Sequence, residues 1–438
     1  MKKGLKQRKQ MTLYTISNLI AGFGSQTYAF AISFYILQTT GSSLSFALQL
    51  ICNVVPRSIA GPFIGELVDR FSKRKIIIIS QLSSLVVVFG LAIYMYMFGL
   101  HLVAIYVATA LLSVTASFTS IAFSAAITEL FSEDYIQKAS SMNQVAISSA
   151  AIASPIIGGI VYGFLPLYGM LFIFVGLFLF AVLLNTQLVF SKKQTKVESP
   201  QHQSLLTNIK IGFEYTKNHP FAMRILIIAL LINFVFAAFE IGYSYTLIHQ
   251  FKIPAASFGI TESGFAFGML GVSILLAIIP TIKRPMQRTK LCLFSTGFVM
   301  LSVVIPYFIP FSMTVLVIYY FSIMFLLGVA ITSTNTIIFT VFQRSIDDQM
   351  KGRFFGLLET FAMAISPISF VLFGILFDYL NAPLLLAGIS IVVIVMIIFL
   401  IPSPLINKID SHLKQEDAQQ VNESVLDLYE EIGGHVIR

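Results

Sequence analysis

Charged residues are scarce in this 438-residue chain: Asp, Glu, Lys and Arg together make up only 11% of it. Soluble globular domains carry about 25% charged residues and about 45–50% apolar residues. Here 57% of the residues are hydrophobic and the mean hydropathy is +0.86, which is more apolar surface than a soluble core buries. Lipid must therefore solvate these side chains. This excludes a cytosolic enzyme, a secreted domain, a coiled coil and a disordered chain.

Chemically versatile residues are scarce as well. The chain has two cysteines and no tryptophan, and Cys52 and Cys292 both fall inside apolar runs. We therefore expect neither a structural disulfide nor a metal centre. The phosphate-binding motif Gly-x-x-x-x-Gly-Lys-Ser/Thr does not occur, so we expect no ATP site and no cofactor. An integral-membrane enzyme acting on a lipid would show paired Asp and His groups at one membrane face; the sequence has none, which favours a protein that is not an enzyme.

Long apolar runs dominate the chain. A membrane-spanning helix needs roughly 20 apolar residues to cross a hydrocarbon core ~30 Å thick. The runs are continuous rather than alternating, so the sequence predicts an all-α integral membrane protein in a lipid bilayer. Twelve spans are expected, at approximately 12–37, 44–68, 75–98, 102–129, 139–163, 167–190, 222–249, 257–282, 289–309, 313–342, 353–378 and 383–401.

The net charge of +8 has a topological explanation. All 28 lysines and arginines except Lys252 and Arg57 fall at the start of the chain, in the even-numbered connections between spans, or in the tail. The positive-inside rule then places these segments, and both termini, in the cytoplasm. No nucleic-acid partner is needed to account for the charge.

The longest polar interruption divides the spans into two sets of six. In the interruption, Leu205, Ile209 and Phe213 recur every four residues, which predicts an amphipathic helix on the inner membrane surface; a plain solvated linker is the alternative. The predicted units are an N-terminal bundle at 1–190, a cytoplasmic linker at 191–221, a C-terminal bundle at 222–402 and a cytoplasmic tail at 403–438.

The two sets also resemble each other in sequence. Each carries an acidic connection, a basic residue and then a Ser-Pro pair inside the following span, at Ser154-Pro155 and Ser366-Pro367. Internal repeats of six helices are typical of one large transporter architecture, in which substrate binds near the midplane between the halves.

The connection between the second and third spans reads GELVDRFSKRK. Its glycine would permit close helix approach, its aspartate would cap or pair at a helix end, and its basic residues would hold the inner membrane face. It resembles the signature loop of the major facilitator superfamily, with Ser72 where that pattern has a second glycine. The resemblance implies two pseudo-symmetric six-helix bundles and a cytoplasmic latch between them during alternating access. The matching residues are Gly65, Asp69, Arg70, Lys73 and Arg74.

The equivalent connection of the second half, IPTIKRPMQRTK, keeps the basic charge but lacks the glycine and the aspartate.

A second motif, SPIIGG, is similar to the Gly-Pro-x-x-Gly-Gly segment of drug–proton antiporters. Its residues are Ser154, Pro155, Gly158 and Gly159, with the serine in place of the first glycine. The proline frees a backbone carbonyl and the glycines allow close packing, so a bend and a sealed helix interface are expected; a merely well-packed glycine pair is the alternative.

Further stretches, including TGSSLSFAL, ITELFSEDYIQKAS and GFEYTKNHPFAMRILII, resemble the macrolide-efflux and enterobactin-exporter type of bacterial facilitator. Members of this group export different compounds, so the resemblance implies efflux of a small molecule without identifying it. It also implies a bacterial plasma-membrane location. We expect the protein to act as a monomer.

Charges inside the spans are the first place to look for coupling to protons. Arg57 lies ~16 Å from the cytoplasmic end of its helix, where a charge is costly unless it is paired or faces water. Glu240 is the favoured proton carrier, and Glu359 is a second candidate that would alternatively pair with Arg57. We expect Glu262 to cap its helix and Glu129 to act as an interfacial latch. Many proton-coupled antiporters carry an Arg in the fourth span, and none occurs here.

The substrate cavity is expected to be large and apolar, because the chain holds 41 Phe and 17 Tyr. Such a pocket suits a bulky lipophilic or cationic guest. These observations favour a proton-coupled exporter of lipophilic or amphiphilic molecules; uptake or flipping of a lipid-like or siderophore-like metabolite is the alternative. The residues expected to line the cavity are Gln26, Tyr28, Phe34, Ser117, Phe236, Tyr243, Tyr320 and Asn335.

Overall fold

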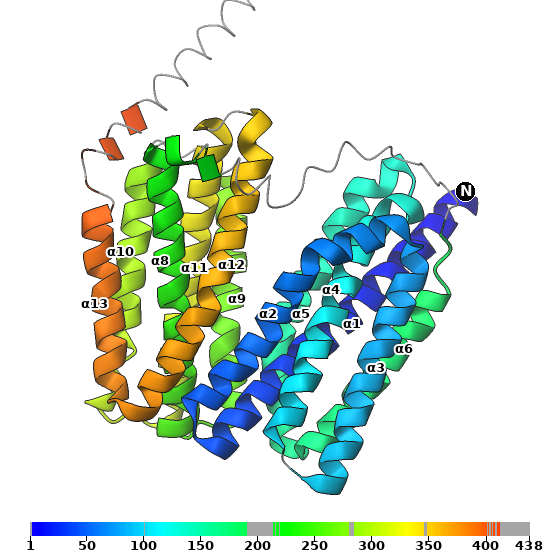
Figure 1. Ribbon diagram of the computed structural model, residues 1–438, viewed down its shortest axis with the longest axis horizontal. Coiled ribbons are helices and arrows are strands. Elements are labelled where there is room, and N and C mark those ends of the chain that lie inside the picture. Colours follow the sequence, from blue (N-terminus) through cyan, green and yellow to red (C-terminus); the bar gives the residue numbers. More distant parts are fainter. Residues whose placement is uncertain are drawn as a thin grey trace, which may run out of the picture.

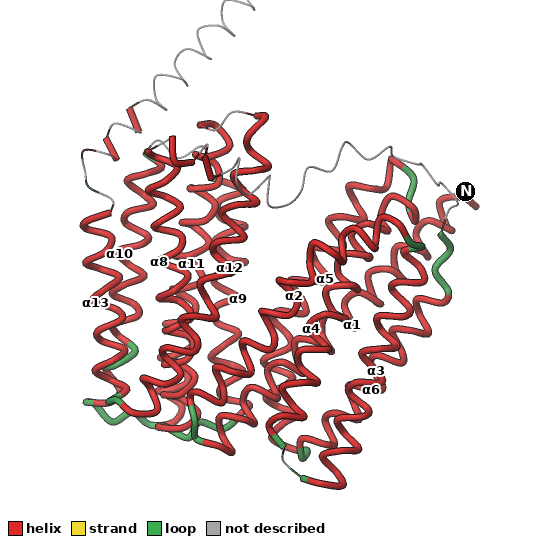
Figure 2. The backbone as a smooth tube through the Cα atoms, in the orientation of Figure 1, coloured by secondary structure: helices red, strands yellow, loops and turns green. Residues whose placement is uncertain are grey.

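The computed structural model describes residues 2–99, 101–190, 213–214, 216–218, 220–279, 284–345 and 348–400, with 402, 404, 406–407 and 410–411. In these ranges every regular element is helical (Figure 2). Twelve helices are long and apolar enough to cross a membrane, which confirms the predicted all-α fold. Of the predicted amphipathic segment in the linker, Leu205 and Ile209 lie outside the described residues.

The helices form two groups, which lie side by side in Figure 1. The first group consists of α1 (Lys2–Thr40), α2 (Ser43–Arg70), α3 (Lys73–Phe98), α4 (Leu102–Leu130), α5 (Glu133–Phe164) and α6 (Leu167–Thr186). The second consists of α8 (Pro220–Tyr245), the π-helical turn η1 (Thr246–Gln250), α9 (Ala255–Ile278), α10 (Pro285–Ser302), the short 3₁₀ turn η2 (Ile305–Tyr307), α11 (Met313–Ser345), α12 (Asp348–Tyr379) and α13 (Ala382–Leu400). We call these groups the N half and the C half.

The connection between α1 and α2 is short, and a serine side chain caps the helix that follows it. Between α1 and α2, Gly41 adopts a left-handed backbone conformation with φ of 63°, which glycine tolerates without strain. The next residue, Ser42, caps α2 by accepting a hydrogen bond from the backbone N–H of Ser45 at 3.2 Å.

Polar side chains inside the N half are paired across helices. Asn185 of α6 accepts a hydrogen bond from the Ser17 hydroxyl at 2.7 Å and donates one to Gln81 of α3 at 2.6 Å, and all three residues are buried. Lipid tails offer no hydrogen-bond partners and are as apolar as the helix surfaces. Hydrogen-bond networks of this kind therefore favour contact between helices over contact with lipid.

The two halves meet along two helix pairs, α5 with α9 and α2 with α12. The backbones of α5 and α9 come so close that a Cβ at Gly159 would collide with the carbonyl oxygen of Ala255, and a Cβ at Gly259 with that of Pro155. Glycine is required at both positions for this seam to form.

The contact between the halves is concentrated toward one end of the helices. This closed end carries the turn at Gly41–Ser42 and the last turn of α12. The helix axes diverge toward the opposite end, where α1 begins and α2 connects to α3 (Figure 1). We call this second end the splayed end.

The α5–α9 seam makes a testable prediction. Gly259→Val is expected to destabilise the protein by about 1–3 kcal/mol, because the added carbons have no space against α5. Gly271→Val is the matched control: it introduces the same β-branched side chain into the same helix, at a position where a Cβ meets no atom within 4 Å. Thermal unfolding of the purified protein should show a lower midpoint for Gly259→Val alone, and equal midpoints would contradict the packing described.

Candidate functional site

The signature connection ties the helices of the N half together. The Lys73 Nζ lies 2.9 Å from the Glu129 Oε1, and both side chains are about four-fifths buried. Arg74 donates a hydrogen bond to the carbonyl oxygen of Thr186 at the end of α6, at 2.8 Å. The start of α3 is therefore fastened to the ends of α4 and α6. Glu129 lies at the end of α4, and its partner is this lysine of the same half.

Two expectations for the same connection are not met. A Cβ at Gly65 would meet no atom within 4 Å, so this glycine makes no close helix approach in the present conformation. Asp69 is exposed, and among the described residues it forms no ion pair and no cap on α3. Arg70 pairs only with Glu66 one turn back in its own helix, at 2.5 Å. The reason is geometric: the connection lies at the splayed end, where the halves diverge.

The SPIIGG motif lies at the seam between the halves. The Ser154 hydroxyl donates to the carbonyl oxygen of Phe23 in α1 at 3.4 Å. Gly158 faces α1, with Thr27 and Phe30 at its surface, and the carbonyl of Pro155 faces α9. The motif thus packs α5 against a helix of its own half on one side and a helix of the opposite half on the other.

The C half holds two carboxylates that are close to each other. The side chain of Glu240 in α8 is exposed at the surface of the protein, that of Glu262 in α9 is half-buried, and the two charges are near enough to repel. No lysine, arginine or histidine within the described ranges forms an ion pair with either of them. The sequence predicts that Glu262 caps its helix, but it does not cap α9, because that helix begins two turns earlier at Ala255.

Aromatic side chains flank this carboxylate pair. The ring of Phe239 lies between those of Phe236 and Tyr243, at centroid distances of 6.4 and 5.9 Å, and Phe258 lies 6.0 Å beyond Tyr243. The Tyr243 hydroxyl is buried near Glu262, and the described residues provide it with no hydrogen-bond partner that meets the usual geometry. In this conformation the hydroxyl is enclosed by the core of the C half.

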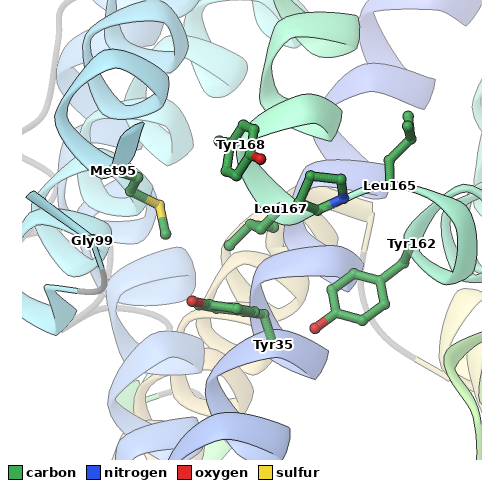
Figure 3. Close-up of a pocket in the computed structure, with 8 residues that line it drawn as sticks. Tyr35, Met95, Gly99, Tyr162, Leu165, Leu167 and Tyr168 are labelled. Carbon is green, nitrogen blue, oxygen red and sulfur yellow. The ribbon is translucent and has the colours of Figure 1, made fainter. Parts of the chain in front are cut away.

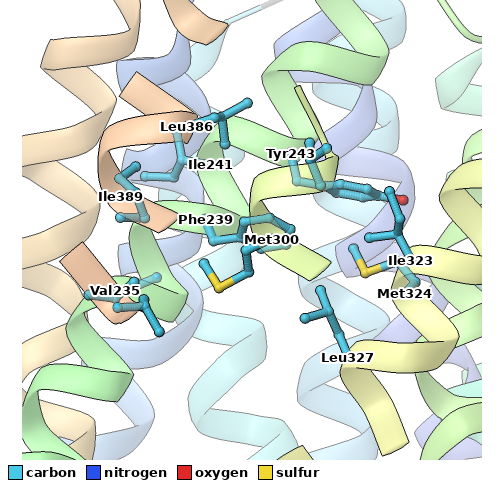
Figure 4. Packing of buried hydrophobic residues seen from close by; sticks show 14 of the residues in the cluster. Val235, Phe239, Ile241, Tyr243, Met300, Ile323, Met324, Leu327, Leu386 and Ile389 are labelled. Carbon is cyan, nitrogen blue, oxygen red and sulfur yellow. The ribbon is translucent and has the colours of Figure 1, made fainter. Parts of the chain in front are cut away.

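Half of the residues expected to line the cavity instead form packed cores. Tyr28 is buried in the N half with its hydroxyl 3.1 Å from that of Thr109, and Tyr320 donates to the carbonyl of Val303 at 2.9 Å. Tyr243 is fully buried (Figure 4), and Phe34 is buried against Phe258. Aromatic residues serve helix packing and ligand binding equally well, and the sequence pattern does not separate the two uses. Gln26, Ser117 and Phe236 are half-buried, and Asn335 is exposed.

Arg57 and Glu359 do not form the pair that the sequence suggested as one option. Both are exposed, and no ion pair joins them. Their helices, α2 and α12, pack together near the closed end, where Gly374 touches Ala47, and the helix axes diverge toward the splayed end (Figure 1).

Two cavities lie elsewhere, near the closed end. One, of about 440 Å³, lies within the N half and is lined mainly by Tyr35, Met95, Tyr162, Leu167 and Tyr168 (Figure 3). The other, of about 410 Å³, is lined by Gln38 and by residues of η1 and the segment after it. Neither is lined by a residue that the sequence analysis assigned to the substrate path.

Twelve spanning helices in two halves that meet along paired seams define a multi-pass membrane transporter rather than an enzyme. The chain belongs to the Major Facilitator Superfamily, whose family model matches residues 14–369. The relatives are bacterial, and the protein is a bacterial membrane protein.

The relatives with assigned names include exporters. The chain is 23% identical over 404 residues to "Macrolide efflux protein A" of Streptococcus pyogenes, covering 91% of this chain and 97% of the relative. It is 24% identical over 386 residues to "Uncharacterized MFS-type transporter YfiS" of Bacillus subtilis, covering 86% and 89%. It is 22% identical over 399 residues to "Multidrug efflux pump Tap" of Mycolicibacterium fortuitum, covering 87% and 95%.

Solved structures share the fold at low identity. A bacterial homologue of the iron transporter ferroportin, in an inward-facing state, superposes with a TM-score of 0.65 at 15% identity, covering 90% of this chain and 98% of that one. The nucleoside transporter NupG superposes with a TM-score of 0.68 at 14% identity, covering 90% and 99%. At this identity the likeness establishes the architecture alone.

The Lys73–Glu129 pair yields a second prediction. Lys73→Met and Glu129→Gln are each expected to destabilise the protein by about 1 kcal/mol. The double variant is expected to lose less stability than the two single losses added together, because either single change already removes the ion pair. Arg70→Met is the control, because the Arg70–Glu66 pair is exposed and should contribute within experimental error. Thermal unfolding of the four variants measures both effects; full additivity at Lys73 and Glu129 would show that the pair contributes nothing.

Proposed function

We propose that this protein is a proton-coupled exporter of lipophilic or amphiphilic small molecules that carry a positive charge, and that it works by alternating access. Support comes from its membership of the superfamily and from relatives named as macrolide and multidrug efflux proteins. The single observation that carries the proposal is the carboxylate pair of Glu240 and Glu262 beside the aromatic rings of α8.

The chemistry of this pair favours a positively charged occupant. Two carboxylates that repel each other in an apolar setting are disfavoured when both are ionised. Either a proton or an organic cation relieves that repulsion, and the half-buried ring of Phe236, one turn before Glu240, adds cation–π attraction for the organic cation. Once a proton or a cationic substrate is bound, the repulsion between the two carboxylates is gone and the other occupant binds less tightly. The pair therefore exchanges substrate for proton.

The cycle then follows from the two helix seams. In the proposed cycle, Glu240 releases its proton and takes up substrate while the splayed end is open. The halves next rock about the seams, so that the splayed end closes and the closed end opens. Protons on the second side displace the substrate and the protonated pair returns. Arg57 and Glu359, exposed beyond the seams, would modulate entry at the splayed end.

The proposal includes orientation and oligomeric state. Both termini, and therefore the splayed end, are placed in the cytoplasm by the basic residues that gather there, so substrate would enter from the cell interior or inner leaflet. Both carboxylates belong to one half of one chain, so a monomer holds the whole exchange site.

The decisive experiment measures coupled transport in proteoliposomes with an imposed proton gradient, using tetraphenylphosphonium and erythromycin as probes. Glu240→Gln is expected to reduce accumulation of the probe against its concentration gradient by at least tenfold, because the amide does not release a proton. Downhill exchange of the probe across the membrane should continue. Glu262→Gln should weaken cation binding. Glu133→Gln, an exposed carboxyl outside the pair, is the control.

Uphill transport by Glu240→Gln at the wild-type rate would remove this residue from the mechanism. Proton movement that no probe stimulates would count against antiport. Cells that accumulate more of the probe when they produce the protein would indicate uptake rather than export.

Orientation has its own test. A single cysteine at His101, in the α3–α4 connection, is expected to react with a membrane-impermeant maleimide added to intact cells. A cysteine at Ser132, in the α4–α5 connection, should react only after the cells are permeabilised. Both positions are exposed, so a reversed pattern would place the splayed end outside.

A further inference from the structure

The closed end contains a carboxylate that serves a helix in the opposite half. Asp378 lies in the last turn of α12, where the partial negative charge of its own helix end disfavours an anion. Its Oδ2 accepts hydrogen bonds from the Ser42 hydroxyl at 2.8 Å and the Leu44 backbone N–H at 3.2 Å, and its Oδ1 accepts one from the Ser43 backbone N–H. The Asp378 carboxylate therefore stabilises the N-terminus of α2 and not its own helix, α12.

This arrangement completes the capping of α2 from two sources. The first backbone N–H groups of a helix have no partner within the helix. In α2, Asp378 accepts from Ser43 and Leu44, while Ser42 accepts from Ser45 through its side chain and from Phe46 through its backbone. Half of these four donors are thus partnered by the C half, and they lose that partner whenever the two halves separate at this end.

Neighbouring contacts hold the carboxylate in register. One turn before Asp378, a Cβ at Gly374 would lie 2.8 Å from the Ala47 side chain and 3.1 Å from the Leu44 backbone, so α12 lies directly on α2. On the other side of the same turn, His249 of η1 packs against Gly41. A small displacement of the halves breaks the charge-assisted bonds, because their geometry depends on this close packing.

We propose that Asp378 is the latch of the closed end: a positioning residue that stabilises the conformation splayed at the opposite end and that must release α2 in each transport cycle. The latch acts on the conformational equilibrium of the empty transporter, so it depends neither on the substrate nor on the coupling ion proposed above.

The chain contains a matched control for this role. Asp410, in the segment after α13, accepts hydrogen bonds from the backbone N–H groups of Met286 at 2.9 Å and Gln287 at 3.2 Å at the start of α10. The chemistry is the same, but both partners belong to the C half. Loss of this cap weakens one helix end without favouring either arrangement of the halves.

The experiment measures distances between spin labels in the full-length protein, without cysteines 52 and 292, in lipid nanodiscs without substrate. One label pair, at Phe164 and Leu384, spans the closed end; the other, at Thr128 and Gln343, spans the splayed end. All four positions are exposed, with one member of each pair in each half. Asp378→Asn is expected to shift the populations about tenfold toward a longer first distance and a shorter second distance. Asp410→Asn should leave both distributions unchanged.

Identical distributions in the Asp378→Asn, Asp410→Asn and unsubstituted proteins would overturn the latch, and so would equal shifts in the two variants. If Asp378→Asn does not yield folded protein, Ser42→Ala replaces it. That variant removes one of the three donors to Asp378, together with the hydroxyl that accepts from the Ser45 backbone within α2, and should shift the populations about threefold in the same direction; no shift would again overturn the latch.

Discussion

Close backbone packing of α5 on α9 and of α12 on α2 holds the two halves together, and the other features of the structure depend on it. Both seams lie toward one end of the helices, and glycines at 159, 259 and 374 permit them. Because the contact is concentrated at that end, the halves splay at the other (Figure 1). Glu240, Arg57 and Glu359 all have exposed side chains in this conformation. A rocking motion about these seams needs no change inside either half.

Two groups among the few charges of the chain have different consequences. Lys73, Glu129, Arg74, Asp378 and Asp410 all act at helix ends, where a charge meets an opposite charge or an unpaired backbone group and stays near water. Glu240 and Glu262 instead lie within helices of the C half, near each other and without a basic partner among the described residues. The first kind fastens helices, and the second is the pair to which we assign proton and cation binding in the proposed cycle.

Sequence reasoning succeeded where one physical signal dominates. The span expected at 44–68 is α2, and that expected at 383–401 is α13, because an apolar run of this length has no stable alternative to a helix in lipid. The ends were less well predicted: α5 begins at Glu133, well before the expected 139, because a helix continues into water after its apolar part ends. Tyr28 and Tyr320, which the sequence predicts to line the cavity, are buried in packed cores in this conformation, since an aromatic ring fits a core as readily as a ligand site.

Length, hydropathy and the placement of basic residues by themselves determined that this chain is a twelve-span membrane protein in two sets of six, and the motif at residues 65–74 indicated its superfamily. Only the tertiary structure decided which side chains act together. Glu240 and Glu262 are 22 positions apart, and Asp378 lies more than 330 positions from the helix start that it caps. A local sequence pattern indicates the period of a helix and whether lipid or water surrounds it. Which residues of distant helices come together depends on how the helix backbones pack.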